Sequence, residues 1–144
     1  MEDSVDFGKC LFNSLQIGVH GKYKDRPRFP DGEFTPELYN CIKNALDTET
    51  FTHLYGYYNA DAVGITVEYE NRLSYIVIHN DLTGFSYTYI NLNNKEDKTQ
   101  VDIGGSTISK KYVYDNKTTI LNIIVIFLTT GEPCSQYEWL ELKE

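Results

Sequence analysis

The sequence predicts an α+β fold in which an antiparallel meander sheet carries two main helices packed on one face. Two apolar segments, 35–47 and 115–131, have helix start and stop signals at their ends. Between them, alternating segments separated by short turns predict neighbouring antiparallel strands over 64–92. The length of 144 residues fits a single domain, 1–144, that buries roughly two-thirds of its unfolded surface.

The first strand is expected within 10–19, where Leu15, Ile17 and Val19 alternate with other residues. A basic connection with two prolines follows at 22–32. We expect this connection to be a solvated loop, because the basic patch is short and lacks the fold context of a nucleic-acid-binding module.

The clearest helix begins at Thr35, which can cap the first turn, with Pro36 at the first helical position. Its apolar stripe consists of Leu38, Cys41, Ile42, Ala45 and Leu46. A stripe on one face predicts that the helix lies across a sheet, with Cys41 in the core. Residues 47–50 end the helix.

The middle of the chain has the pattern of a meander. The expected strands are 51–58, 64–70, 73–80 and 85–92. Asn71-Arg72 forms the turn between the second and third of these strands, and 81–84 has the composition of a β-turn. A polar loop at 93–100 precedes a further short strand at 101–103, and 106–114 leads into the second helix.

The last thirty residues contain a strongly apolar helix and a closing strand. Asp115 or Asn116 can cap the helix, and Gly131 followed by Pro133 stops it. The β-branched run 123–126 favours a strand by propensity alone, but the start and stop signals bracket an ordinary helix length. Since this helix is apolar nearly all round, we expect it in the middle of the fold. Alternation after residue 136 predicts a half-buried closing strand. We expect Trp139 on this strand to be structural, and contact with a partner is the alternative.

This C-terminal pattern resembles that of a known family. The apolar helix is followed by Thr-Gly-Glu-Pro at 130–133, a few variable residues, and Glu-Trp-Leu-Glu-Leu at 138–142. The combination resembles the first-numbered immunity-protein family of bacterial polymorphic-toxin and contact-dependent growth inhibition systems. The resemblance covers 115–142, and further upstream it extends only to the order of strands and helices. The helix is richer in isoleucine than the Ala- and Glu-rich helix usual in such proteins. The resemblance implies a non-enzymatic cytoplasmic antitoxin that blocks one cognate toxin domain, often a nuclease or deaminase.

The formal net charge of −8 limits the classes of partner. It opposes binding to nucleic acid, whose phosphates require a basic patch, and to anionic membranes. It is compatible with a basic protein partner, although an acidic surface also serves solubility alone. The apolar run 120–128 is too short to span a membrane, and no secretory signal is expected after the acidic start Met1-Glu2-Asp3.

Catalytic and metal-binding patterns are missing from the sequence. The three cysteines, Cys10, Cys41 and Cys134, are widely spaced and have the pattern of reduced cytosolic thiols. His20, His53 and His79 have no metal-ligand spacing, so we expect no metal, cofactor or catalytic residue. The alternative is a small RNase-like hydrolase that uses His20 or His79, although its negative charge would repel RNA. A general protein-interaction module is a third possibility.

The expected toxin contacts lie on or beside the meander. They are Glu68, Glu70, Asp81, Tyr87, Tyr89, Glu96, Asp97 and Asp102. Acidic side chains would neutralise the basic residues of the toxin, while aromatic rings would fill its cleft. Two interpretations remain open: the tyrosines could instead belong to the sheet core, and the paired glutamates could be a solvated face.

Overall fold

The structure is a computed structural model that describes residues 14–19, 33–58, 62–70, 72–90, 99–103, 105–114 and 116–143. Among the described residues, the helices are α1 (Pro36–Asp47) and α2 (Lys117–Thr130), and a 3₁₀ turn lies at Lys110–Tyr112. The strands are β1 (Ser14–Val19), β2 (Phe51–Tyr58), β3 (Val63–Glu70), β4 (Leu73–Asn80), β5 (Phe85–Ile90), β6 (Gln100–Ile103), β7 (Ser106–Ser109), β8 (Val113–Tyr114) and β9 (Glu138–Lys143). Several predicted features lie outside the described residues, namely 10–13, His20, 22–32, Asn71, 91–98 and Asp115.

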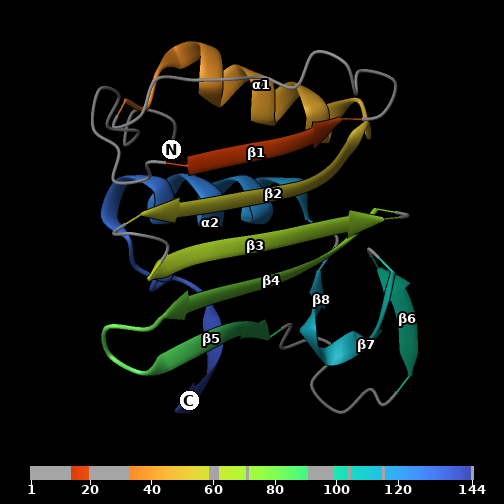
Figure 1. The fold of residues 1–144 in the computed structure, drawn as a ribbon. Helices are drawn as coiled ribbons and strands as arrows, with labels where there is room; N and C mark the ends of the chain where they lie inside the picture. The colour runs from red at the N-terminus through yellow and green to blue at the C-terminus, as the bar shows by residue number, and fades with distance from the viewer. Residues whose placement is uncertain are drawn as a thin grey trace.

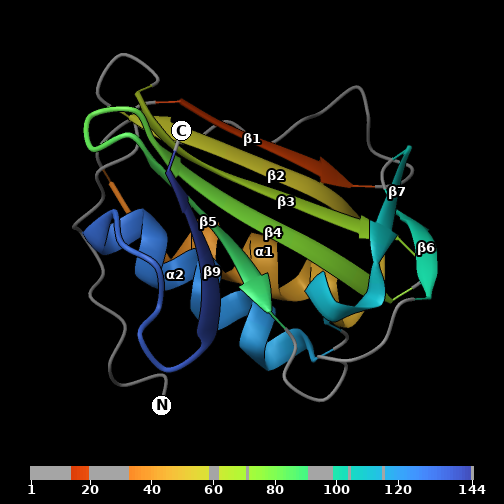
Figure 2. The ribbon, with the colours of Figure 1, turned by 90° about the horizontal axis from the view of Figure 1, so that it is seen from below.

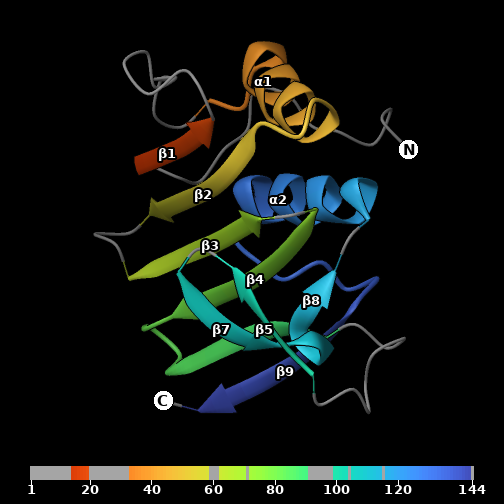
Figure 3. The ribbon, with the colours of Figure 1, turned by 90° about the vertical axis from the view of Figure 1, so that its right-hand side faces the viewer.

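The main sheet is antiparallel, with strand order β1-β2-β3-β4-β5-β9. Both helices lie on one of its faces (Figures 1, 2 and 3). This arrangement confirms the predicted α+β class, with a meander and two helices. The closing strand β9 pairs with β5 and so forms the last strand of the sheet.

One part of the topology differs from the prediction. The predicted strand at 101–103 corresponds to β6, but it pairs with β7 in a separate two-stranded hairpin rather than extending the meander. This hairpin stands at one end of the main sheet (Figure 2). The segment 106–114 is also more structured than expected, because it contains β7, the 3₁₀ turn and β8. β8 pairs with the start of β4, while β5 pairs with its second half.

Helix α1 forms where its local signals predict it. The Thr35 hydroxyl accepts a hydrogen bond from the Leu38 N–H at 3.1 Å, and Pro36 occupies the first turn, where no N–H partner is needed. Its buried stripe consists of Leu38, Ile42, Ala45 and Leu46. Cys41 is half-buried and packs against the core, as the sequence predicts.

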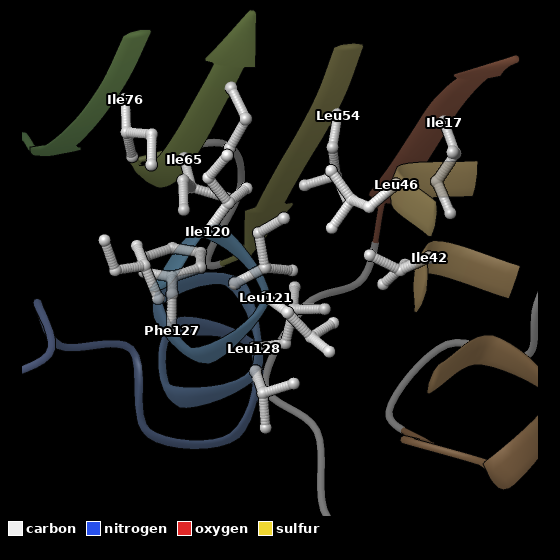
Figure 4. Packing of buried hydrophobic residues seen from close by; sticks show 14 of the residues in the cluster. Ile17, Ile42, Leu46, Leu54, Ile65, Ile76, Ile120, Leu121, Phe127 and Leu128 are labelled. Carbon is white, nitrogen blue, oxygen red and sulfur yellow. The ribbon is translucent and has the colours of Figure 1, made fainter. Parts of the chain in front are cut away.

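Helix α2 is buried around most of its circumference. The Asn116 side chain caps it by accepting a hydrogen bond from the Thr119 N–H at 3.2 Å. Gly131 ends it in the left-handed conformation, with φ 75°, and donates its N–H to the Phe127 carbonyl at 2.7 Å. Its side chains pack between the sheet and α1 (Figure 4). None of the described helices is long and apolar enough to cross a membrane.

The side chain of Trp139 packs on the core side of the sheet and so anchors the closing strand β9. Its indole N–H donates a hydrogen bond to the Cys134 carbonyl at 2.9 Å, and its ring meets the edge of Tyr89 at a centroid distance of 5.6 Å. Tyr137 contacts Tyr89 in the same edge-to-face manner. Trp139 therefore makes the contacts expected of a structural residue.

The core position of α2 can be tested with two isoleucines of the same helix. Ile124 is fully buried, whereas Ile126 is half-buried at the margin of the core. Ile124→Ala is expected to lower the free energy of unfolding by about 2–5 kcal/mol, because it removes buried methyl groups and leaves a cavity. Ile126→Ala is the matched control and is expected to cost clearly less. Urea denaturation of both variants measures the difference, and equal losses would contradict this packing.

Candidate protein-binding face

The side of the sheet opposite the helices forms the candidate site. Because strand side chains alternate between two faces, each strand directs every second residue away from α1 and α2. No described helix lies over this side of the sheet (Figures 2 and 3). We call it the open face, and in β1 to β5 its positions include Gln16, His53, Tyr55, Tyr57, Thr66, Glu68, Glu70, Tyr75, Val77, His79, Ser86 and Thr88.

A network of polar and aromatic groups occupies the middle of the open face. Tyr55 on β2 donates its hydroxyl hydrogen bond to Oε1 of Glu68 on β3. The His53 ring stacks on the Tyr55 ring, with centroids 4.7 Å apart and planes inclined by 21°. His53 is held at both nitrogens, because Nδ1 lies 3.1 Å from the Thr52 hydroxyl and Nε2 lies 3.3 Å from Nε2 of Gln16. The network therefore presents a carboxylate beside a fixed pair of rings.

The hydroxyl of Tyr55 remains protonated over a wide pH range. Burial disfavours the phenolate and is the largest cause of its raised pKa. The hydrogen bond to Glu68 and the negative charge of Glu68 act in the same direction, and together they raise the pKa of Tyr55 to about 12. Tyr55 therefore serves Glu68 as a stable neutral donor.

A second pair of rings lies on the open face near the strand ends at which the β4–β5 turn is located. The rings of Tyr57 and His79 are 5.9 Å apart and inclined by 44°. Between them on β3 is Gly64, where an added Cβ would lie 2.4 Å from Cδ1 of Tyr57 and 2.5 Å from Cε1 of His79. The absence of a side chain at Gly64 thus allows both rings to lie across the strand.

The fixed charges that β1 to β5 place on the open face at described positions are of one sign. Glu68 and Glu70 project from β3, and no lysine or arginine occupies a described open-face position in β1 to β5. The arginine nearest in sequence, Arg72, forms an ion pair with Glu49 at 2.5 Å beyond the end of β3. The face is therefore negative and aromatic.

The predicted contact residues are distributed over several parts of the molecule. Glu68 and Glu70 share the open face, with Glu68 half-buried and Glu70 exposed. Asp81 is exposed in the turn between β4 and β5, beside Leu82, whose exposed fraction is 65%. Asp102 is exposed on β6, in the separate hairpin at one end of the main sheet, and accepts a hydrogen bond from Thr107 at 3.0 Å. Glu96 and Asp97 lie outside the described residues.

The two tyrosines of β5 point toward the helices. Tyr87 is in register with buried Ile78, which places it on the core side of the sheet, and Tyr89 follows on the same side. Tyr89 is only 4% exposed, and Tyr87 is half-buried against the core. The core interpretation of the tyrosine pattern therefore describes these residues, and neither belongs to the open face. Their burial does not support the toxin contacts predicted for them, and the contacts predicted for the other residues stay predictions.

The predicted contact set did not include the aromatic residues of the open face. His53, Tyr55 and Tyr57 recur at every second position of β2, opposite Leu54 and Gly56, which face the core. This alternation is the signal that could have identified them. Tyr75 on β4 was also missed, although it lies directly across from Glu68 in the sheet register.

The geometry does not bring the histidines together. His53 is in register with Glu68, and Glu68 is in register with Tyr75, four residues before His79. The two histidines are thus two strands apart and separated by roughly 13 Å along the strand direction. His20, the other residue of the hydrolase alternative, lies outside the described residues. Within the described ranges, no three His, Cys, Asp or Glu side chains are grouped so that they could hold a metal ion.

The fold and the open face define an α+β protein whose described helices cover one face of the sheet. The other face is a negative, aromatic surface. No protein-family model matches the chain, and comparison with curated proteins and with solved structures likewise gives no match. Function must therefore be inferred from the open face itself.

The Tyr55–Glu68 contact can be tested by spectrophotometric titration. Tyr55→Phe is expected to remove one tyrosine that ionises near pH 12, above the ordinary pKa of 10.0. The difference between wild type and this variant is needed because the pKa values of Tyr58, Tyr75 and Tyr87 are also raised. In Glu68→Gln the pKa of Tyr55 is expected to fall, since a negative charge that opposes the phenolate is removed.

The raised pKa of Tyr55 also determines in which direction the stability changes with pH. The pKa of Tyr55 is higher in the folded state than in the unfolded chain. Its contribution to stability is therefore complete below pH 10.0 and is lost as the pH rises toward about 12. If the Tyr55→Phe variant instead loses a tyrosine that ionises at the ordinary pKa of 10.0, the titration would contradict the contact between Tyr55 and Glu68.

Proposed function

We propose that this protein is an immunity protein that binds one cognate bacterial toxin domain through the open face and blocks it. The observation that supports this most is the negative, aromatic surface on a sheet whose other side is filled by helices. The resemblance of residues 115–142 to an immunity-protein family supports the same proposal. The proposed site of action is the cytoplasm, where nucleic-acid targets of such toxins lie.

The proposed mechanism is occlusion of a basic cleft. A toxin that acts on nucleic acid needs lysines and arginines to hold phosphates. Glu68 and Glu70 would meet those cations, and the net charge of −8 would speed and orient the approach. The rings of Tyr55 and Tyr57 would exclude water from the cleft, because tyrosine buries a large area with little loss of side-chain entropy.

The rigidity of the open face favours tight binding. Cross-strand pairing fixes the backbone of β2, β3 and β4, and stacking fixes His53 on Tyr55. Side chains that are already ordered lose less entropy when a partner binds. The face therefore has the preorganisation that an inhibitor requires.

The turn between β4 and β5 extends this surface. Its shape is held by the Asn80 side chain, whose Oδ1 accepts hydrogen bonds from the N–H groups of Leu82 at 3.0 Å and Thr83 at 3.3 Å. The turn presents the apolar side chain of Leu82 next to the carboxylate of Asp81. An exposed leucine on an ordered turn is suited to a pocket on a partner protein.

The function is tested with the toxin domain encoded by the adjacent upstream gene. Expression of that domain alone is expected to stop growth, and co-expression of this chain is expected to restore it. The two proteins should co-purify with a sub-micromolar dissociation constant, measured by calorimetry. Growth of cells that express the toxin domain without this chain, or the absence of a complex, would refute the assignment.

The contact surface is tested separately by charge reversal. The Glu68→Lys/Glu70→Lys double variant is expected to weaken the complex by roughly tenfold or more and to reduce the salt dependence of its association rate. The control is Glu37→Lys/Asp47→Lys on α1, which changes the net charge equally but on the helix side. Equal effects of the two double variants would show that only overall charge matters, and unchanged affinity in the first would exclude the open face.

A further inference from the structure

We propose that Glu68 and the His53–Tyr55 pair form a receptor for one arginine side chain of the partner protein. As to the identity of the partner, this inference rests on the proposed function, but the recognition chemistry follows from the open face alone. Three properties of the site support it: an oriented carboxylate, an adjoining aromatic surface and the absence of lysine and arginine from the described open-face positions of β1 to β5.

The carboxylate of Glu68 is oriented but only partly used. Its Oε1 accepts the hydrogen bond of the Tyr55 hydroxyl. Within the described part of the chain, the second oxygen Oε2 has no hydrogen-bond partner. A carboxylate held on one side and unused on the other can accept the parallel N–H groups of a guanidinium.

The rings beside Glu68 suit a planar cation. His53 lies directly across from Glu68 in the register of β2 and β3, and its ring is nearly parallel to that of Tyr55. Tyr75 lies across from Glu68 on the other side, on β4. A guanidinium can stack flat on an aromatic ring while it donates hydrogen bonds at its edge. An ammonium group is a compact point charge and cannot combine the two contacts in this way.

Among the residues that the structure describes, the site has no cation of its own. The described open-face positions of β1 to β5 contain no lysine or arginine. The ion pairs found among the described residues, Lys43–Asp47 and Arg72–Glu49, involve other carboxylates. A guanidinium from a partner would therefore supply a counter-ion that no described lysine or arginine gives Glu68. The adjoining rings favour arginine over lysine at this site.

The inference is tested without any toxin. N-acetyl-arginine amide and N-acetyl-lysine amide are titrated separately into the full chain, and backbone and ring resonances are followed by NMR. The arginine probe is expected to bind with a dissociation constant on the order of millimolar. It should shift resonances of His53, Tyr55 and Glu68, and its affinity should exceed that of the lysine probe roughly fivefold or more.

Variants separate the carboxylate from the fold. Glu68→Gln keeps an acceptor for the Tyr55 hydroxyl, so the fold is expected to be retained, but binding of the arginine probe should fall to the level of the lysine probe. Tyr55→Phe keeps the ring and removes the orienting hydroxyl, so an intermediate loss is expected. Glu37→Gln on α1 is the control that removes one charge away from the open face.

The outcomes distinguish this inference from the proposed function. Equal binding of the two probes, no binding of either, or full arginine binding by Glu68→Gln would overturn the arginine receptor. If the chain nevertheless protects cells from the toxin, the proposed function stands and only the inferred contact fails. Selective arginine binding by a chain that neutralises no toxin would support the receptor and refute the function.

Discussion

Helix α2 packs apolar side chains in several directions at once, against the inner side of the sheet and against α1. Ile123, Ile124 and Phe127 are completely buried, so the helix cannot expose a broad face to solvent without a large hydrophobic cost. Placing both helices on one side of the sheet satisfies this requirement. The other side is then released from core packing and can carry polar and aromatic residues. The location of the open face is thus a consequence of how α2 is buried.

The helices could be predicted from the sequence because their determinants are local. The caps at Thr35 and Asn116 and the stop at Gly131 act within a few residues of each helix end. Strand positions in the meander were also predictable, since alternation and turn composition are read along the chain. The pairing partner of the strand at 101–103 could not be predicted, because the choice between the meander and a separate hairpin depends on contacts that local alternation does not encode. The four-residue strand at 106–109 was missed, because so short a polar segment has little periodicity.

It was harder to predict which side of each strand faces the core. This orientation determines which residues form the open face. Tyr87 and Tyr89 on β5 show the same alternation as Tyr55 and Tyr57 on β2. In β5 the tyrosines face inward, with Tyr87 in register with Ile78, whereas in β2 Leu54 faces inward, in register with Ile17. Alternation predicts that two faces differ, but only pairing with neighbouring strands determines which of them is buried. The glutamates of β3 could be predicted as a pair, yet the contact of Glu68 with Tyr55 on β2 could not.

The fold does not require a charged residue as the hydrogen-bond acceptor of Tyr55. A half-buried acceptor for the Tyr55 hydroxyl could be an uncharged glutamine, which avoids the desolvation cost of a carboxylate. Glu68 instead places a full negative charge where neither of the described ion pairs provides a cation. In the free protein, solvent at the open face lowers this cost. In a complex, the exclusion of water would raise it unless the partner brought a positive group to the same position. A carboxylate fixed in this way therefore favours binding partners that place a cation beside it and disfavours those that do not.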